Sequence, residues 1–82
     1  MEYMEVIKTY YDSGKLKSEV VMINNKKEGE YKEYYENGQL YIIQSYINDK
    51  KHGEYKRYYE NGQLNVKSIY IDDWFHKICE KR

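Results

Sequence analysis

The stretch EYKEYYENGQLY, residues 30–41, decides the fold, because a nearly identical stretch, EYKRYYENGQLN, follows at residues 54–65. Pairs of adjacent tyrosines begin at Tyr10, Tyr34 and Tyr58, which sets the period at 24 residues. A glycine and a leucine follow each pair at constant spacing: Gly14, Gly38 and Gly62, then Leu16, Leu40 and Leu64. A period between about 20 and 50 residues is typical of a repeat array, in which each unit packs only against its neighbours.

Each unit contains two turn signals. Asn37-Gly38 and Asn61-Gly62 are flanked by strand-forming residues and predict two-residue type I′ hairpin turns, of which Ser13-Gly14 is a weaker copy. A second, longer turn rich in Asn, Lys and Gly is expected at Asn24–Gly29 and at Asn48–Gly53. Two strands in every unit, joined by short turns, predict an antiparallel β-meander.

The third unit differs from the first two after residue 72, where the chain reads DDWFHKICEKR and Lys77 stands in place of the second glycine. Asp72 or Asp73 can cap the N-terminus of a helix. We therefore expect a short capping helix over residues 73–82, which would cover the open edge of the sheet. A frayed tail is the alternative, because chain termini are often loose.

The predicted architecture is one all-β domain over residues 1–82, with units at about 10–33, 34–57 and 58–73 followed by the cap. Seven or so strands at about 4.8 Å spacing make an elongated, twisted sheet roughly 30 Å long. A chain of 82 residues then has nothing left for a second layer except the short tail.

Pairing Tyr35 with Leu40 across the turn, without a bulge, predicts which side chains share a face. One face carries Ile7, Tyr11, Leu16, Val20, Met22, Tyr31, Tyr35, Leu40, Ile42, Tyr46, Tyr55, Tyr59, Leu64, Val66 and Tyr70; the other carries mostly Lys and Glu, among Tyr10, Tyr34 and Tyr58. Because soluble proteins rarely expose contiguous apolar patches above a few hundred Å², the first face is expected to bind a partner, to self-associate or to curl into a groove. The candidate partner-binding residues are Tyr31, Tyr35, Leu40, Tyr46, Tyr55, Tyr59, Leu64 and Tyr70.

Other interpretations of these tyrosines stay open. Tyrosine is enriched at binding hot spots, but the same rings can simply pack across strands to hold the sheet together. Stacked aromatic rows also suit sugars or choline, although choline-binding repeats are rich in Trp and this chain has one. Single-stranded nucleic acid is disfavoured, because Glu30, Glu33, Glu36, Glu54 and Glu60 interleave with the Lys and Tyr residues.

The composition excludes several function classes. Fourteen basic residues balance 14 acidic ones, so no net charge attracts nucleic acid or an anionic membrane. The single cysteine, Cys79, forms no internal disulfide, and the acidic N-terminal segment lacks the features of a signal peptide. No apolar run approaches the ~20 residues of a membrane span. We expect a soluble, cytoplasmic chain, and processing from a longer precursor stays open.

No constellation of residues predicts catalysis, so we expect no enzyme activity, no cofactor and no metal. His76 and Cys79 have a spacing that can bind a metal on a helix, but zinc needs four ligands and only His52 could be added. As a nucleophile, Cys79 would need a base and an orienting partner, which the tail does not supply. Cys79 is more simply a small apolar residue of the cap.

The string YYENGQL, followed a dozen residues later by KK-x-GEY, resembles the MORN-repeat variant family of bacteria. The resemblance covers Tyr10 to about Asp73 and is strongest at residues 26–40 and 50–64. It is weaker in the first unit, and Asn25 and Asp49 replace the second glycine of the family pattern.

The resemblance implies an elongated antiparallel sheet and a role in protein–protein contact. Some bacterial members are described as the antitoxin or immunity half of a toxin pair, whereas eukaryotic MORN proteins are scaffolds once thought to bind phospholipid. It carries over no catalytic motif. The leading hypothesis is therefore a non-enzymatic module that binds another protein, such as a toxin; a self-associating scaffold is the alternative, and a lipid- or sugar-binding surface is less favoured.

Overall fold

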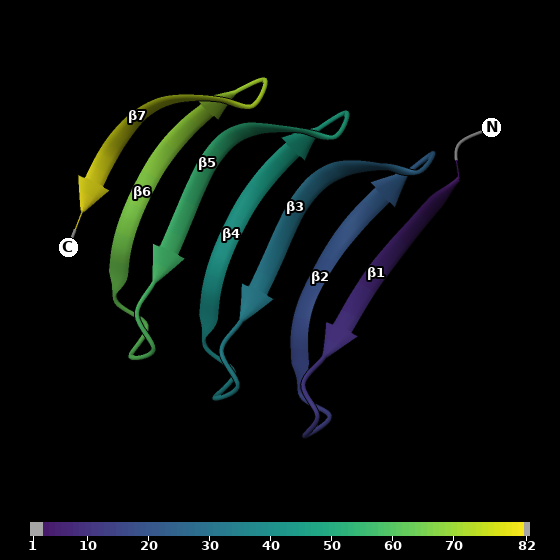
Figure 1. Cartoon of the computed structure of the whole chain (residues 1–82), viewed down its shortest axis with the longest axis vertical. Helices are drawn as coiled ribbons and strands as arrows, with labels where there is room; N and C mark the ends of the chain where they lie inside the picture. Colours follow the sequence, from purple (N-terminus) through teal and green to yellow (C-terminus); the bar gives the residue numbers. More distant parts are fainter. Residues whose placement is uncertain (1–2, 82) are drawn as a thin grey trace.

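The computed structural model describes residues 3–81, and the side chains of residues 3–74. One antiparallel sheet holds seven strands in chain order: β1 (Met4–Tyr10), β2 (Leu16–Ile23), β3 (Lys26–Tyr34), β4 (Leu40–Ile47), β5 (Lys50–Tyr58), β6 (Leu64–Ile71) and β7 (Trp74–Lys81). Figure 1 shows this meander, with β1 and β7 at opposite edges. The prediction of an all-β antiparallel meander is confirmed.

The predicted capping helix over residues 73–82 is wrong, because the chain forms strand β7 there and pairs antiparallel with β6. Asp72 and Asp73 both have positive φ angles, 51° and 71°, as do Asn24-Asn25 and Asn48-Asp49 in the earlier units. Asn and Asp tolerate this left-handed conformation, and two such residues in succession make a type I′ hairpin turn. The third unit therefore keeps its second turn, and only residue 82 of the predicted cap lies outside the described residues.

The type I′ prediction for the two Asn-Gly pairs is also wrong, although a hairpin forms at each. Positive φ occurs there only at Gly38 (93°) and Gly62 (92°). The N–H of Gly38 donates to the carbonyl of Tyr35 at 3.0 Å, and Gly38 itself then takes the left-handed conformation. This pattern is a three-residue loop, a type I turn followed by a left-handed residue. The side chain of Asn37 supports the loop by accepting the N–H of Gln39 at 2.8 Å.

The second pair of repeated glycines lies within strands rather than in the long turns that the sequence predicted. Gly29 in β3 and Gly53 in β5 have φ angles of 95° and 99°. Each lies at a shift in register against the preceding strand, which is a β-bulge. Bulges bend strands, and Figure 1 shows β3 and β5 arching where β1, which has Glu5 at the equivalent position, runs straighter.

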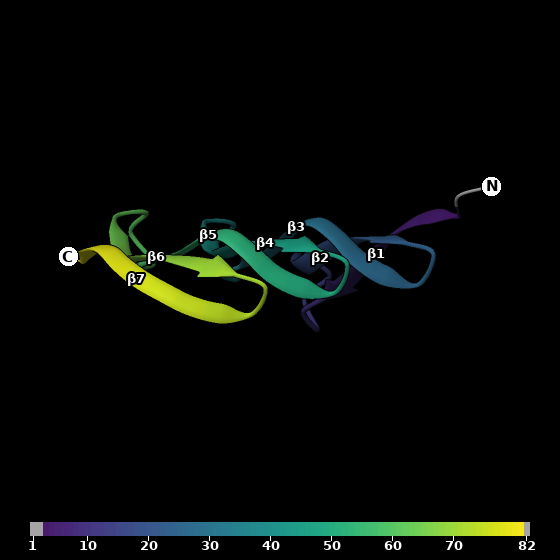
Figure 2. The ribbon, with the colours of Figure 1, turned by 90° about the horizontal axis from the view of Figure 1, so that it is seen from above.

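The sheet is a single layer. The molecule extends 42 × 36 × 13 Å along its principal axes, and Figure 2 shows the thin profile from above. Two packed sheets would lie about 10 Å apart before side chains are counted, so 13 Å leaves room for one. No hydrophobic side chain among residues 3–74 is buried, and the two buried residues in that range are Gln44 and Ser68.

Tyrosine hydroxyls connect successive units. The hydroxyl of Tyr11 donates to the carbonyl of Tyr34 at 2.6 Å, and the hydroxyl of Tyr35 donates to the carbonyl of Tyr58 at 2.7 Å. The second tyrosine of one pair thus bonds to the first tyrosine of the next pair. Because the acceptor is a main-chain carbonyl, this contact accounts for the second tyrosine of the pair, at Tyr11 and Tyr35.

The two-residue turns make a second set of contacts between units. The side chain of Asp49 accepts the N–H of Lys27 at 2.7 Å, and its own N–H donates to the Lys27 carbonyl at 3.0 Å. Asp73 repeats both bonds with Lys51, at 2.7 and 2.8 Å. Each turn is therefore hydrogen-bonded to a strand of the preceding unit, β3 in the first case and β5 in the second.

Replacing Tyr35 by Phe should lower the free energy of unfolding by about 1 kcal/mol, because it removes one hydrogen bond and leaves its carbonyl acceptor behind. For a domain of this size that corresponds to a loss of about 4–8 °C in melting temperature, measurable by circular dichroism. Tyr10→Phe is the matched control, since Tyr10 is 58% exposed. Equal melting temperatures for the two variants would contradict the role of the Tyr35 hydroxyl.

Gly29→Ala and Gly53→Ala should each cost about 1–2 kcal/mol, because an L-residue is strained at this φ. A Cβ at residue 29 meets open space and one at residue 53 meets Ser45 only at 3.4 Å, so backbone strain, not crowding, sets the cost. Chemical denaturation measures both variants. Wild-type stability in either one would show that the bulge does not require glycine.

Candidate protein-binding surface

Two adjacent rows of side chains cross the sheet on opposite faces. Directly opposed residues of an antiparallel ladder share a face, and the first row holds Val20, Tyr31, Gln44, Tyr55 and Ser68. We call the face with this row the tyrosine face. Two residues along the strands, the same face also carries Glu33, Ile42, Arg57 and Val66 on one side of this row, and Tyr46 and Tyr70 on the other.

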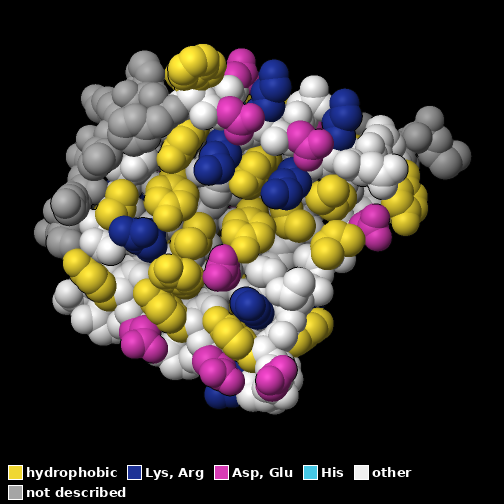
Figure 3. Space-filling model, viewed as in Figure 1, with side chains coloured by type: hydrophobic (Ala, Val, Ile, Leu, Met, Phe, Trp, Pro, Cys, Tyr) yellow, Lys and Arg dark blue, Asp and Glu magenta, His cyan; other side chains and the backbone are white. Residues whose placement is uncertain are grey.

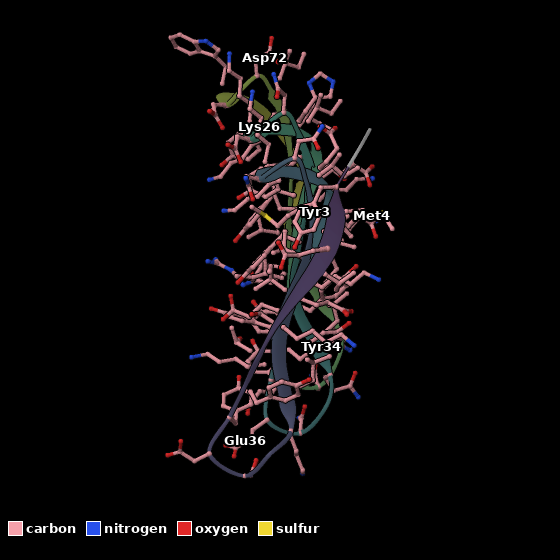
Figure 4. The ribbon with its side chains drawn as sticks, turned by 90° about the vertical axis from the view of Figure 1, so that its right-hand side faces the viewer. Tyr3, Met4, Lys26, Tyr34, Glu36 and Asp72 are labelled. Atoms are coloured by element: carbon pink, nitrogen blue, oxygen red, sulfur yellow. The ribbon has the colours of Figure 1, made fainter. Side chains whose placement is uncertain are left out.

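The second row lies on the opposite face and is charged almost throughout: Lys8, Glu19, Lys32, Ile43, Lys56 and Lys67. Glu54 lies 3.3 Å from the Lys56 ammonium and 3.1 Å from that of Lys67. These lysines, hydrogen-bonded to the carboxylate, hold the pKa of Glu54 below its usual value. The opposite face thus presents ion pairs to solvent, whereas the first row contains no charge. Figure 4 shows side chains projecting on both sides of the ribbon.

The uncharged row packs closely enough to bury polar groups. Gln44 lies opposite both Tyr31 and Tyr55 and is only 2% exposed, and Ser68 beyond Tyr55 is 4% exposed. The Gln44 side-chain amide donates to the carbonyl of Ser45 at 2.8 Å, whereas its Oε1 has no hydrogen-bond partner among the described residues. Water is therefore excluded between these rings even though the sheet has no second layer.

Three tyrosines of this face have raised pKa values. The hydroxyl of Tyr31 donates to Glu33 at 2.8 Å, and burial together with this hydrogen bond raises the pKa of Tyr31 to about 12. Burial also raises the pKa of Tyr46 and of Tyr55, in the latter case against the opposing effect of Arg57. These phenols therefore remain uncharged hydrogen-bond donors throughout the physiological range.

Two lysines lie over tyrosine rings at equivalent positions of successive units. The Lys27 ammonium is 4.9 Å from the ring centre of Tyr46, and that of Lys51 is 5.1 Å from Tyr70. Tyr70 also meets the ring of Tyr55 edge to face at 6.3 Å. Figure 3 shows one face of the sheet, on which hydrophobic side chains gather with Lys, Arg, Asp and Glu among them.

The model of the MORN repeat variant family matches residues 6–24, 27–48 and 51–72, more than half of the chain. The chain belongs to this family. MORN repeats form a non-catalytic module that is generally associated with binding proteins or membranes. Comparisons with curated proteins and with solved structures gave no match.

Four of the tyrosines predicted as binding residues come together in the MORN sheet. Tyr31, Tyr46, Tyr55 and Tyr70 share the tyrosine face. Tyr35 and Tyr59 lie instead in the hairpin loops that follow β3 and β5. The ring of Tyr35 packs 4.5 Å from that of Tyr41, and its hydroxyl bonds to the next unit.

Leu40 and Leu64 do not join them, and the face predicted for these leucines is wrong. Leu40 lies opposite Tyr34 rather than Tyr35, and Leu64 lies opposite Tyr58. A one-residue bulge at Tyr41 and its equivalent causes the difference, because one extra residue turns the following side chain to the other face. The sequence carried no clear signal for this bulge. The burial of Gln44 was not predicted either, because the equivalent residue of the first unit is the apolar Val20.

Among residues 3–74, no three His, Cys, Asp or Glu side chains gather as metal ligands would. The side chains of His76 and Cys79 lie outside the described residues. The described residues also include no helix with the length and hydropathy that crossing a membrane requires.

The raised pKa of Tyr31 predicts a specific loss of stability in alkali. The phenol ionises at about pH 10 in the unfolded chain and at about pH 12 in the folded chain. Its contribution to the free energy of unfolding is therefore complete below about pH 10 and lost by about pH 12. Denaturation midpoints measured across this window should fall more steeply for the wild type than for Tyr31→Phe. Parallel curves would contradict the assignment.

Proposed function

We propose that this MORN-variant chain is a non-catalytic module that binds another protein through the tyrosine face. The observation that carries the proposal is that a sheet 13 Å thick buries no hydrophobic side chain among residues 3–74. The apolar groups of the tyrosine face therefore lie at the surface of the isolated chain. Contiguous patches of this kind on soluble proteins usually mark an interaction site.

The tyrosine face suits a protein partner better than the opposite face does. Its central row is uncharged, and the row beside it holds one carboxylate and one guanidinium, those of Glu33 and Arg57. Covering the central row of the other face would instead bring several charges out of water. Tyr31 and Tyr55 are already ordered by Glu33 and by the ring of Tyr70, so little side-chain freedom is lost on binding. Tyrosine also combines apolar area with a hydroxyl donor, which is why it is enriched at hot spots.

The dimensions and charges of the face indicate the kind of partner. A surface within a 42 × 36 Å outline is large enough for a standard interface of about 800 Å² on each partner. Lys27 and Lys51 stand over Tyr46 and Tyr70 along this face. We expect the partner to present apolar groups to the tyrosine row and carboxylates to these two lysines.

The most specific form of the proposal is a bacterial cytoplasmic antitoxin or immunity protein that covers a toxin. The resemblance to family members described in that way supports it. A broad, rigid and chemically inert surface also suits a protein that acts by blocking another one.

A pull-down from the lysate of the native host, followed by calorimetric titration of the purified partner, tests the proposal. Tyr31→Ala combined with Tyr55→Ala should weaken binding by about 30-fold or more, since a hot-spot tyrosine contributes about 2 kcal/mol. Lys32→Ala combined with Lys56→Ala is the matched control, because these neighbours in sequence lie on the opposite face.

An intact β-sheet spectrum in both double variants shows that any loss of affinity is local. If the alanine pair at residues 31 and 55 unfolds the chain, Tyr46→Ala with Tyr70→Ala probes the same face. Unchanged affinity in a folded tyrosine variant, or an equal loss in the lysine control, would refute the proposed surface.

A further inference from the structure

Strand β1 exposes an unusual amount of apolar surface at the free edge of the sheet. Of nine large hydrophobic side chains that are exposed among the described residues, five lie at or beside β1: Tyr3 (59%), Met4 (67%), Val6 (50%), Ile7 (40%) and Tyr10 (58%). Figure 4 looks onto this edge, with Tyr3 and Met4 labelled, and no described strand lies beyond it.

The main chain of β1 presents a row of hydrogen-bonding groups along the same edge. The N–H of Tyr3 donates to the Asn24 side chain at 2.9 Å, and its carbonyl accepts the Asn24 N–H at 2.7 Å, so Tyr3 faces β2. In an antiparallel strand alternate residues turn their N–H and C=O groups to opposite sides. The outward-facing residues of β1 are therefore Met4, Val6, Lys8 and Tyr10.

The repeat gives independent support for the outward direction of the main-chain groups of Tyr10. Tyr10 is the equivalent of Tyr34 and Tyr58, whose carbonyls both accept a tyrosine hydroxyl from the preceding unit. The Tyr10 carbonyl thus points to the side from which a further strand would approach.

The edge of β1 has few of the features that keep edge strands apart. Bulges, prolines and lysines normally protect such edges. β3 and β5 have a left-handed glycine and a bulge on the side of the preceding strand, whereas β1 has Glu5 at that position, without a left-handed φ angle. The strand contains no proline and a single lysine, Lys8.

We propose that β1 pairs antiparallel with β1 of a second copy of this chain, across a two-fold axis at Ile7. Because the described residues form an odd number of antiparallel strands, β1 and β7 run in the same direction. A head-to-tail contact in the same sheet orientation would therefore make a parallel ladder, which is less stable for each residue than an antiparallel one. A two-fold axis perpendicular to the sheet makes the antiparallel ladder and closes the assembly as a dimer.

Charge and overlap select the register. An axis at Glu5 or at Lys8 places two like charges directly opposite each other, which is destabilising. An axis at Ile7 pairs the whole strand with itself: Met4 with Tyr10, Glu5 with Thr9, Val6 with Lys8, and Ile7 with Ile7 of the second copy. An axis at Val6 leaves Tyr10 without an opposing strand residue.

This pairing uses the edge of β1 alone and does not depend on the proposed partner. Because the axis is perpendicular to the sheet, both tyrosine faces point the same way. The dimer therefore presents two copies of the proposed binding surface on one continuous sheet.

Light scattering during size exclusion tests the dimer over a range from about 1 μM to about 1 mM, since an edge contact smaller than about 800 Å² on each partner is expected to be weak. The mass should rise from 10.1 kDa to twice that value with concentration. Val6→Pro should abolish the rise, because it removes an outward N–H without touching the ladder to β2. Val6→Thr is the matched control that keeps the N–H and should still dimerise.

Disulfide trapping tests the register. In a Cys79→Ser background, Ile7→Cys should oxidise to a covalent dimer, because the Cα atoms of a non-hydrogen-bonded pair lie about 4.5 Å apart. Thr9→Cys should not, since Thr9 opposes Glu5. A mass of 10.1 kDa at every concentration, a dimer that persists in a folded Val6→Pro variant, or equal cross-linking of both cysteine variants would overturn the proposal.

Discussion

The sheet has one layer, and most other features of the molecule follow from that constraint. Without a second layer no apolar side chain can be enclosed, so the usual large hydrophobic contribution to stability is limited. The chain relies instead on long antiparallel ladders and on contacts repeated between units. Tyr35 illustrates the solution, because its ring packs on Tyr41 while its hydroxyl bonds to the next unit. Tyrosine suits a sheet whose faces are only partly buried, because its ring packs against neighbours while its hydroxyl can form a hydrogen bond, which an aliphatic side chain cannot do.

The same constraint links stability to recognition. Tyr31 and Tyr55 lie opposite the buried Gln44 on its two neighbouring strands, and they also form part of an uncharged row that no second layer covers. The two interpretations of the tyrosines, as packing groups and as binding groups, are therefore compatible for Tyr31 and Tyr55. The loop tyrosines differ, because the hydroxyl of Tyr35 is already engaged in joining two units. On the other face, Lys32 pairs with Glu30, and both Lys56 and Lys67 pair with Glu54. These charged side chains favour exposure of that face to solvent.

The sequence alone determined the meander, the period and the grouping of Tyr31 with Tyr55. These properties are local or strictly repeated. Alternation with a period of two places every second residue on one face, and a hairpin needs only a few turn residues such as Asn37-Gly38. The central ladders also follow the simple register, since Tyr31 pairs with Gln44 as the unbulged alignment requires. The absence of a second layer followed from counting strands against chain length.

Only the tertiary structure decided where the backbone departs from that pattern. Whether Asn-Gly forms a two-residue turn or a three-residue loop depends on the twist and pairing of both strands, and this choice moved Leu40 to the other face. Asp72-Asp73 is compatible with a helix cap or a tight turn, and pairing with β6 selected the turn. The hydroxyl of Tyr11 finds its acceptor 23 residues away, a relation that exists only once two units lie side by side. Periodicity in the sequence specifies which conformation and which face each residue favours. The positions of bulges and of contacts between units depend instead on how neighbouring strands pair in the folded sheet.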